Sequence, residues 1–126
     1  MSLSIIIPTF NRAADIEPLL MDIASQSMPP EEVLLVDDGS CPNELLAYRA
    51  LVANYGQLFR LIEKPENERR VGPAASRNRG ASIATGKYVA FVDDDDRWIS
   101  TDHVRVGLSM LEQSGADYLF ADMCTL

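Results

Sequence analysis

The chain has 126 residues, of which 47% are apolar and 24% are charged, and its formal net charge is −8. This length is typical of one domain with a buried core, and the composition excludes a disordered or low-complexity chain. The negative charge argues against nucleic acid as the main partner, because phosphate binding requires a basic surface, so we expect one globular domain over residues 1–126.

Short apolar segments alternate with segments of helical period, and turn residues lie between them. This alternation predicts an α/β fold with a mainly parallel sheet and flanking helices. The predicted strands are Leu3–Ile7, Glu32–Val36, Leu58–Ile62, Tyr88–Val92 and Asp117–Asp122, with Tyr118 and Phe120 in the core; the predicted helices are Ala14–Ser25, Pro42–Ala53, Pro73–Ala84 and Asp102–Gln113. Continuous apolar strands imply burial on both faces of the sheet. Ligands of such sheets bind beyond the carboxyl ends of the strands, so the residues after each strand are the candidate site.

The first predicted strand leads into Pro8, Thr9, Phe10, Asn11 and Arg12. Pro8 is expected to end the hydrogen-bonded ladder, since proline has no amide hydrogen. Phe10 can then face the crevice as a stacking surface for a nucleotide base. A plain strand-to-helix turn capped by Asn11 is the competing interpretation.

Two carboxylates, Asp37 and Asp38, end the second strand and precede Gly39 and Ser40. One of them can accept a hydrogen bond from the imide N–H of a uracil, because Gly39 allows the backbone to turn away. Such a carboxylate contributes to recognition more than to packing, so loss of Asp38 is expected to leave the fold intact. The alternative is an ordinary Asp-Gly-Ser turn with Ser40 as a helix cap.

The predicted helix that begins at Pro73 is rich in small residues and carries Arg77 and Arg79. A helix start presents backbone N–H groups, and arginine adds positive charge, so this segment suits a phosphate. The competing interpretation is a helix that packs through its small residues and leaves its arginines in solvent. This interpretation has more weight for Arg79 than for Arg77.

Four consecutive aspartates, Asp93 to Asp96, follow the fourth strand. Carboxylates about 5 Å apart repel by about 3 kcal/mol per pair at an effective dielectric of about 20, so the run indicates a bound cation. In an extended chain, Asp93 and Asp95 would share one side and Asp94 and Asp96 the other. Oxygen ligands favour Mn²⁺ or Mg²⁺, which commonly connect carboxylates to a diphosphate. An acidic helix start is the alternative.

The remaining residues carry few signals of their own. Cys41 and Cys124 are too few and too far apart for a disulfide framework or a zinc site, so a reducing compartment is expected. No apolar run approaches the length of a membrane span, and residues 1–12 lack the features of a secretory signal. The sequence therefore predicts a cytoplasmic chain, which would reach the inner face of a membrane only through a part outside these residues.

Together, these motifs resemble the family 2 glycosyltransferases, which have the GT-A fold, from Ser4 to about Met123. Residues Ile5–Arg12 are similar to the first strand and nucleotide loop of the family, and Val36–Ser40 to its uridine-binding turn. Residues Ser76–Gly80 are similar to its central helix motif, and Phe91–Trp98 to its Asp-X-Asp segment with a following aromatic residue. Each motif alone is weak, but their common order and spacing are specific.

The resemblance implies transfer of a sugar from a UDP-type nucleotide sugar to an acceptor, with inversion and with help from Mn²⁺ or Mg²⁺. It implies that Asp38 binds the uracil and that Asp95, together with Asp93, holds the metal; the register of these ligands within four consecutive aspartates stays open. The other residues expected to contact the nucleotide are Pro8, Thr9, Phe10, Arg12, Arg77 and Asp94. The acceptor can be a glycan, a lipid or a small molecule.

Family domains are longer, and their catalytic base and acceptor-binding segments lie beyond the last residue of this chain. We therefore expect a donor-binding, nucleotide-sugar domain of the GT-A type, Rossmann-like in its architecture, that transfers little or no sugar and whose catalytic base is unknown. A nucleotide-sugar module that only binds is one alternative. A phospho-accepting receiver domain is another and weaker one, because its acidic pair would follow the first strand, where Pro8 and Thr9 stand here.

Overall fold

The computed structural model describes residues 2–65, 67–121 and 123–124. The elements follow one another as β1 (Leu3–Thr9), α1 (Glu17–Ala24), β2 (Glu32–Asp37), α2 (Pro42–Tyr55), β3 (Phe59–Ile62), α3 (Pro73–Ile83), β4 (Tyr88–Phe91) and α4 (His103–Ser114). The helix predicted from Ala14 begins three residues later, with Pro18 in its first turn. Within the described residues, no helix has the length and apolar character that a membrane crossing requires.

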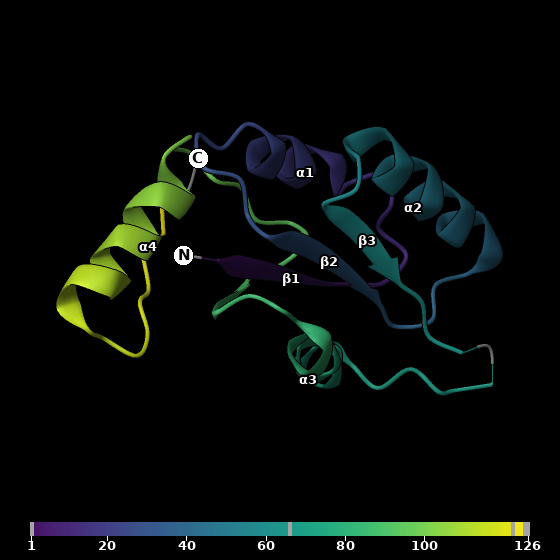
Figure 1. The fold of residues 1–126 in the computed structure, drawn as a ribbon. Helices are drawn as coiled ribbons and strands as arrows, with labels where there is room; N and C mark the ends of the chain where they lie inside the picture. The colour runs from purple at the N-terminus through teal and green to yellow at the C-terminus, as the bar shows by residue number, and fades with distance from the viewer. Residues whose placement is uncertain (1, 66, 122, 125–126) are drawn as a thin grey trace.

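The strands form one sheet in the order β3-β2-β1-β4, and each neighbouring pair is parallel. Figure 1 shows α1 and α2 on one face of this sheet and α3 on the other, while α4 lies beside the amino-terminal end of β1. The predicted α/β fold with a parallel sheet and flanking helices is therefore confirmed.

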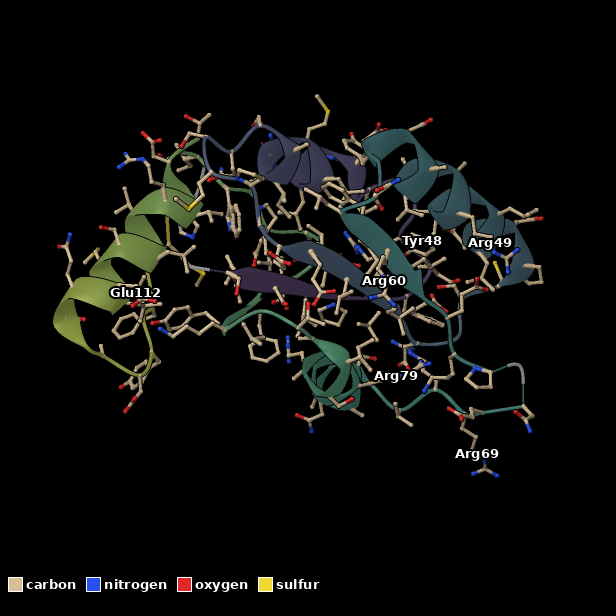
Figure 2. All side chains as sticks on the ribbon, in the orientation of Figure 1. Tyr48, Arg49, Arg60, Arg69, Arg79 and Glu112 are labelled. Atoms are coloured by element: carbon tan, nitrogen blue, oxygen red, sulfur yellow. The ribbon has the colours of Figure 1, made fainter. Side chains whose placement is uncertain are left out.

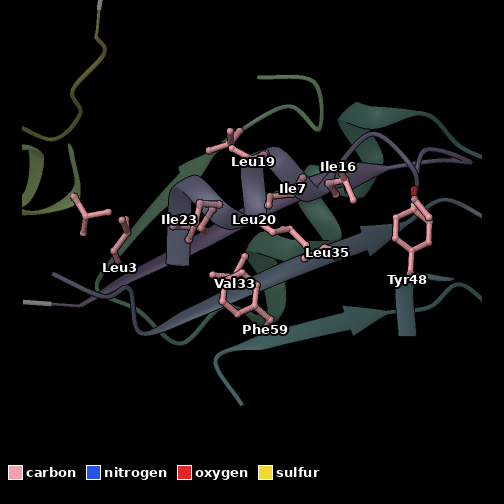
Figure 3. Close-up of a cluster of buried hydrophobic side chains, with 14 of the residues drawn as sticks. Leu3, Ile7, Ile16, Leu19, Leu20, Ile23, Val33, Leu35, Tyr48 and Phe59 are labelled. Atoms are coloured by element: carbon pink, nitrogen blue, oxygen red, sulfur yellow. The ribbon is translucent and has the colours of Figure 1, made fainter. Parts of the chain in front are cut away.

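Side chains of the two central strands alternate between the faces of the sheet. On one face, the main core joins these strands to the inner sides of α1 and α2 (Figure 3); its fully buried members include Ile5, Ile7, Leu19, Leu20, Ile23, Val33 and Leu35. On the other face, a smaller cluster of Ile6, Leu34 and Val36 lies under α3. The predicted burial on both faces is confirmed for β1 and β2.

The edge strand β4 departs from that prediction, since Val89 and Phe91 are 38% and 53% exposed. The predicted strand Asp117–Asp122 is wrong for residues 117–121, which form no strand, and its last residue lies outside the described residues. Tyr118 and Phe120, expected in the core, are 78% and 81% exposed. An alternating apolar pattern makes a strand only where a neighbouring backbone completes the hydrogen bonds, and this segment is not paired with β4.

Gly80 lets α3 approach the sheet closely. A Cβ atom on Gly80 would lie 2.6 Å from Ile6 Cγ2 and 3.0 Å from Val36 Cγ2, and both of these side chains are fully buried. We expect Gly80→Ala to lower the free energy of unfolding by about 1–3 kcal/mol through overpacking, in spite of the better helix propensity of alanine. Denaturant unfolding followed by circular dichroism measures this loss.

The control is Gly107→Ala in α4, because a Cβ atom there would meet only the end of the Leu119 side chain, at 3.4 Å. This variant should keep the wild-type stability or gain slightly from helix propensity. Equal unfolding midpoints for the two variants would contradict the close packing at Gly80.

Candidate functional site

The segments that follow β1, β2 and β4 meet at one edge of the sheet, together with loop residues 63–65 and 67–72 and the start of α3. Hydrogen bonds connect Thr9 to Asp94 and Asp38 to Val71 across this edge. The strands shown in Figure 1 run in the same direction, which places their carboxyl ends together. The residues predicted to form the site are therefore neighbours in space.

Pro8 lies inside β1 and pairs with Val36, so the prediction that it ends the ladder is wrong. The backbone hydrogen bonds of β1 go alternately to the β2 side and to the β4 side. Thr9 C=O accepts from the N–H of Asp38, which follows β2, and Ile6 C=O accepts from the N–H of Val92, which follows β4. Pro8 lies two residues after Ile6, so its backbone groups also point toward the β4 side. The pairing of β1 with β4 ends at Ile6, before Pro8 is reached. The missing amide hydrogen of Pro8 therefore removes no ladder bond.

The two aspartates after β2 have different partners. Asp37 closes the turn, because its Oδ2 accepts hydrogen bonds from the N–H groups of Gly39 at 2.8 Å and Ser40 at 2.9 Å. The Ser40 hydroxyl donates to the other oxygen of Asp37 and accepts from the N–H of Asn11. Ser40 is thus no helix cap, since α2 has Cys41 at its N-cap position. Asp37 and Ser40 build the turn and connect it to the loop after β1.

Asp38, which is 3% exposed, binds the loop that precedes α3. Its Oδ1 accepts from the N–H of Val71 at 2.9 Å and its Oδ2 from the N–H of Gly72 at 2.8 Å. Lys64 Nζ lies 3.1 Å from Oδ1, and Arg70 Nε lies 3.4 Å from Oδ2. Burial disfavours the charge of Asp38, but the two backbone bonds and Lys64 outweigh burial and hold its pKa below the ordinary value. Asp38 therefore has a structural role that the sequence did not reveal.

The Phe10 ring faces the same loop. Arg70 Cζ lies 3.7 Å from the centroid of this ring, which is the geometry of a cation–π contact. The guanidinium is flat and delocalised, so this face of Phe10 accepts a planar group. The preceding residue, Arg69, points away from the rest of the chain (Figure 2). Arg70 thus connects Phe10 to Asp38, the two residues predicted to bind the base.

The four aspartates after β4 form a turn, because the N–H of Asp96 donates to the C=O of Asp93 at 3.1 Å. The extended chain assumed for this segment is therefore wrong, and the simple alternation of the four side chains does not apply. A turn directs the carboxylates toward different neighbours and so reduces their mutual repulsion.

Two of these carboxylates contact other parts of the predicted site. Asp94 Oδ2 accepts from the Thr9 hydroxyl at 2.9 Å, and Arg12 Nε lies 3.4 Å from its Oδ1. Burial raises the pKa of Asp94 above its ordinary value, although Thr9 and Arg12 act in the opposite direction. Arg77 Nη2 donates to Asp93 Oδ1 at 2.7 Å. The loop after β1, the start of α3 and the acidic segment are thereby connected.

The two carboxylates predicted to hold a metal, Asp93 and Asp95, are both open to solvent. Among residues 2–65, 67–121 and 123–124, no three Asp, Glu, His or Cys side chains gather closely enough to hold an ion by themselves. A magnesium-like ion needs no such group, because one or two carboxylates, a diphosphate and water complete its shell. Oxygen-only donors also suit Mn²⁺ or Mg²⁺. The residues present therefore fit an ion that binds together with a nucleotide.

Sequence analysis missed two sets of contacts around the site. Tyr48 of α2 is fully buried, and its hydroxyl lies 2.5 Å from Thr9 Oγ1. Asp22 of α1 accepts from Arg97 Nε at 2.7 Å and from the N–H of Trp98 at 2.9 Å. The apolar spacing in α2 would have placed Tyr48 on the core side of the helix, whereas no local signal distinguishes Asp22 from a surface acid.

Two curated bacterial proteins illustrate the similarity of this chain to known sequences. It is 32% identical to the uncharacterized glycosyltransferase YibD of Escherichia coli (strain K12), over 95% of this chain and 35% of that protein. It is 35% identical to the amylovoran biosynthesis glycosyltransferase AmsB of Erwinia amylovora, over 89% of this chain and 36% of that protein. The chain thus spans about a third of the length of these relatives.

Solved structures and a family model agree with these sequence matches. S. aureus TarS 1-349, in complex with UDP-GlcNAc, matches with a TM-score of 0.78 and 29% identity, over 93% of this chain and 33% of that one. The mannosyltransferase PcManGT from Pyrobaculum calidifontis, in complex with GDP-Man and Mn²⁺, matches with a TM-score of 0.74 and 33% identity, over 86% of this chain and 32% of that one. The model of Glycosyl transferase family 2 matches residues 4–122, which confirms the resemblance and the GT-A type of fold expected from the motifs. This chain therefore belongs to glycosyl transferase family 2.

Proposed function

We propose that this chain binds the nucleotide-sugar donor of a glycosyltransferase, with a UDP-type sugar as the donor and Mn²⁺ or Mg²⁺ beside its diphosphate. The observation that carries the proposal is the meeting of Phe10, Asp38, Arg77 and the acidic segment at one edge of the parallel sheet. These residues supply an aromatic face, a buried acceptor, a cation and exposed carboxylates. The first two groups suit a nucleotide base, and the last two suit a diphosphate and its metal ion.

The base would bind between Phe10 and Asp38. The Phe10 face already carries one flat group, the Arg70 guanidinium, so a base stacks there only when Arg70 shifts. Each carboxylate oxygen of Asp38 has two lone-pair sites, and one backbone N–H occupies a site on each oxygen. The imide N–H of a uracil would use a second site, at the expense of the contact with Lys64 or Arg70. Adenine has no imide N–H, so this arrangement favours a uracil over an adenine.

The diphosphate would lie between α3 and the acidic segment. Arg77, whose guanidinium reaches Asp93, would bind phosphate oxygens, and Asp95 with Asp93 would hold the metal. Asp94, fixed between Thr9 and Arg12, would face the ribose. A bound divalent ion stabilises the negative charge that a departing diphosphate develops. PcManGT, a relative of similar fold, was solved with Mn²⁺ and a nucleotide sugar together.

Sugar transfer also requires an acceptor and a base. In an inverting transfer, a carboxylate removes the proton of the acceptor hydroxyl as its oxygen attacks the anomeric carbon. The carboxylates placed above have other tasks, namely Asp38 at the base and Asp93 to Asp95 at the diphosphate and ribose. We therefore propose the donor half of the reaction for these residues and assign the catalytic base to none of them.

Titration calorimetry with UDP, GDP and ADP, each in the presence of Mn²⁺, tests the proposal. We expect UDP to bind more tightly than ADP, and UDP at 100 times its Kd to raise the free energy of unfolding by about 2.7 kcal/mol. The variant Arg69→Ala is the control for the loss of a positive charge, because this arginine points away from the rest of the chain (Figure 2), and it should bind UDP as the wild type does. Absence of binding for every nucleoside diphosphate would overturn the proposed function, and equal affinities for UDP and ADP would overturn the assignment of the base site.

A further inference from the structure

Tyr48 has an unusual place in the core, at its boundary with the candidate site. The side chain is fully buried, and Figure 3 shows it at the carboxyl end of the sheet, with its hydroxyl oxygen pointing toward the loop after β1. That hydroxyl lies 2.5 Å from Thr9 Oγ1 and accepts a hydrogen bond from the N–H of Arg12 at 2.9 Å. Both contacts go to the predicted nucleotide loop.

The direction of each hydrogen bond in this group follows from the number of protons. Thr9 has one hydroxyl proton, which it donates to Asp94 Oδ2 at 2.9 Å. The Tyr48 hydroxyl therefore donates to Thr9 Oγ1 and accepts from Arg12, which uses one donor site and one acceptor site of the phenol. A directed chain of hydrogen bonds thus runs from Arg12 through Tyr48 and Thr9 to the acidic segment.

This chain of bonds connects two strand ends that the sheet does not connect. Pairing between β1 and β4 ends at Ile6, with the bond from the N–H of Val92 to the Ile6 C=O. Beyond that bond, contacts of Thr9 and Arg12 with Asp94 join the two segments. Tyr48 contacts both of the residues of β1 and its loop that make this connection.

We propose that Tyr48 is a positioning residue of the donor site: through Thr9 and Arg12, its hydroxyl holds the nucleotide loop and the acidic segment in a fixed relation. The inference rests on the proposed function, since it concerns how the same site is held together. Tyr48 does not itself touch the donor, because it is fully buried. A phenylalanine would fill the same space in the core, so packing alone does not require the hydroxyl.

Tyr48→Phe is expected to lower the affinity for UDP in Mn²⁺ about tenfold, the effect typical of groups that orient metal ligands. The loss should be smaller in the presence of a chelator, because the acidic segment that the hydroxyl holds in place contributes to binding through the metal. The deciding quantity is therefore the ratio of the UDP affinity in Mn²⁺ to the UDP affinity in chelator, and Tyr48→Phe should lower this ratio. A merely structural role would lower the unfolding temperature and leave this ratio unchanged for the folded protein.

Tyr55→Phe is the matched control, since Tyr55 lies on the same helix and its hydroxyl donates to the exposed carboxylate of Glu17, at 3.2 Å, away from the candidate site. This variant should keep the wild-type ratio. Thr9→Val should lower the ratio as Tyr48→Phe does, and the loss in the double variant should be smaller than the sum of the two single losses, because both changes interrupt the same chain of bonds. A folded Tyr48→Phe protein with the wild-type ratio would overturn the inference.

A second measurement without ligand separates this inference from the proposed function. In two-dimensional NMR spectra of the free protein, Tyr48→Phe and Thr9→Val should both shift the amide signals of Asp93, Asp94 and Asp95, and Tyr55→Phe should not. Unmoved signals in Tyr48→Phe would refute the connection to the acidic segment. If the signals shift but the wild type fails to bind UDP, the connection stands and the proposed function fails.

Discussion

Asp95→Asn is expected to lower the affinity of this chain for UDP in Mn²⁺ by at least about tenfold, and up to about 100-fold, because even groups that only orient a metal ligand have effects of this size. The side chain of Asp95 is exposed within the turn that follows β4, where a diphosphate would reach it. Asparagine keeps the size of the side chain and one oxygen, but it removes the charge that attracts a divalent ion. Calorimetric titration of UDP, with and without Mn²⁺, measures the change.

A chelator should lower the affinity of the wild type by a similar factor and that of Asp95→Asn by much less. Asp117→Asn is the control for the loss of one negative charge, because Asp117 is exposed and lies outside the site, and it should bind as the wild type does. Asp96→Asn tests the register, since a loss there as large as at Asp95 would move the ligand by one position. Wild-type affinity for UDP that is the same in chelator and in Mn²⁺ would refute a metal at this segment.

The fold was predictable because its strongest signals are local. Apolar runs such as Ile5–Ile7 and Val33–Val36 become the buried central strands, and prolines at the starts of α2 and α3 lie in their first turns, as expected. The error at residues 117–121 has a different origin. An apolar alternation shows that a strand is possible, but a strand forms only where a neighbour supplies hydrogen bonds, and sequence pattern does not identify that neighbour.

The position of the site was predictable for the same reason as the fold, because parallel strands bring their carboxyl ends to one edge. Partners distant in sequence were not predictable. The bonds of Asp38 go to Val71 and Gly72, and those of Asp94 go to Thr9, across 33, 34 and 85 positions, respectively. The turn at Asp93 to Asp96 was missed for a related reason. Repulsion between neighbouring carboxylates predicts that the charges separate, but it does not predict which backbone conformation separates them.

Asp38→Ala is expected to lower the free energy of unfolding by about 3–5 kcal/mol, the usual result of removing one partner of a buried ion pair. Lys64, whose side chain is 5% exposed, would then remain buried without this carboxylate, and the N–H groups of Val71 and Gly72 would lose their acceptor. The same change should weaken UDP binding, because the proposed acceptor for the uracil is gone. Denaturant unfolding and calorimetry measure the two effects separately.

The pH dependence of stability gives an independent check on the structural role of Asp38. Its pKa lies below the ordinary value of 3.8, so the folded state binds the proton less readily than the unfolded chain does. The stabilisation is therefore fully present above pH 3.8 and is lost as the pH falls through the lower pKa of the folded state. In Asp38→Asn this contribution is absent at every pH, so the difference in unfolding free energy between wild type and variant should shrink as the pH falls below 3.8. A constant difference would contradict the depressed pKa.

The double variant Asp38→Ala/Lys64→Met separates the two roles of Asp38. Methionine keeps the length and apolar stem of Lys64 but carries no charge, so the buried ion left by Asp38→Ala disappears. Replacing both partners of a buried pair costs much less than removing one, so most of the lost stability should return. UDP affinity should stay low, because methionine and alanine supply no acceptor for the imide N–H. If the double variant instead recovers wild-type affinity together with stability, Asp38 acts on the fold of the loop alone, and the base must find its acceptor elsewhere.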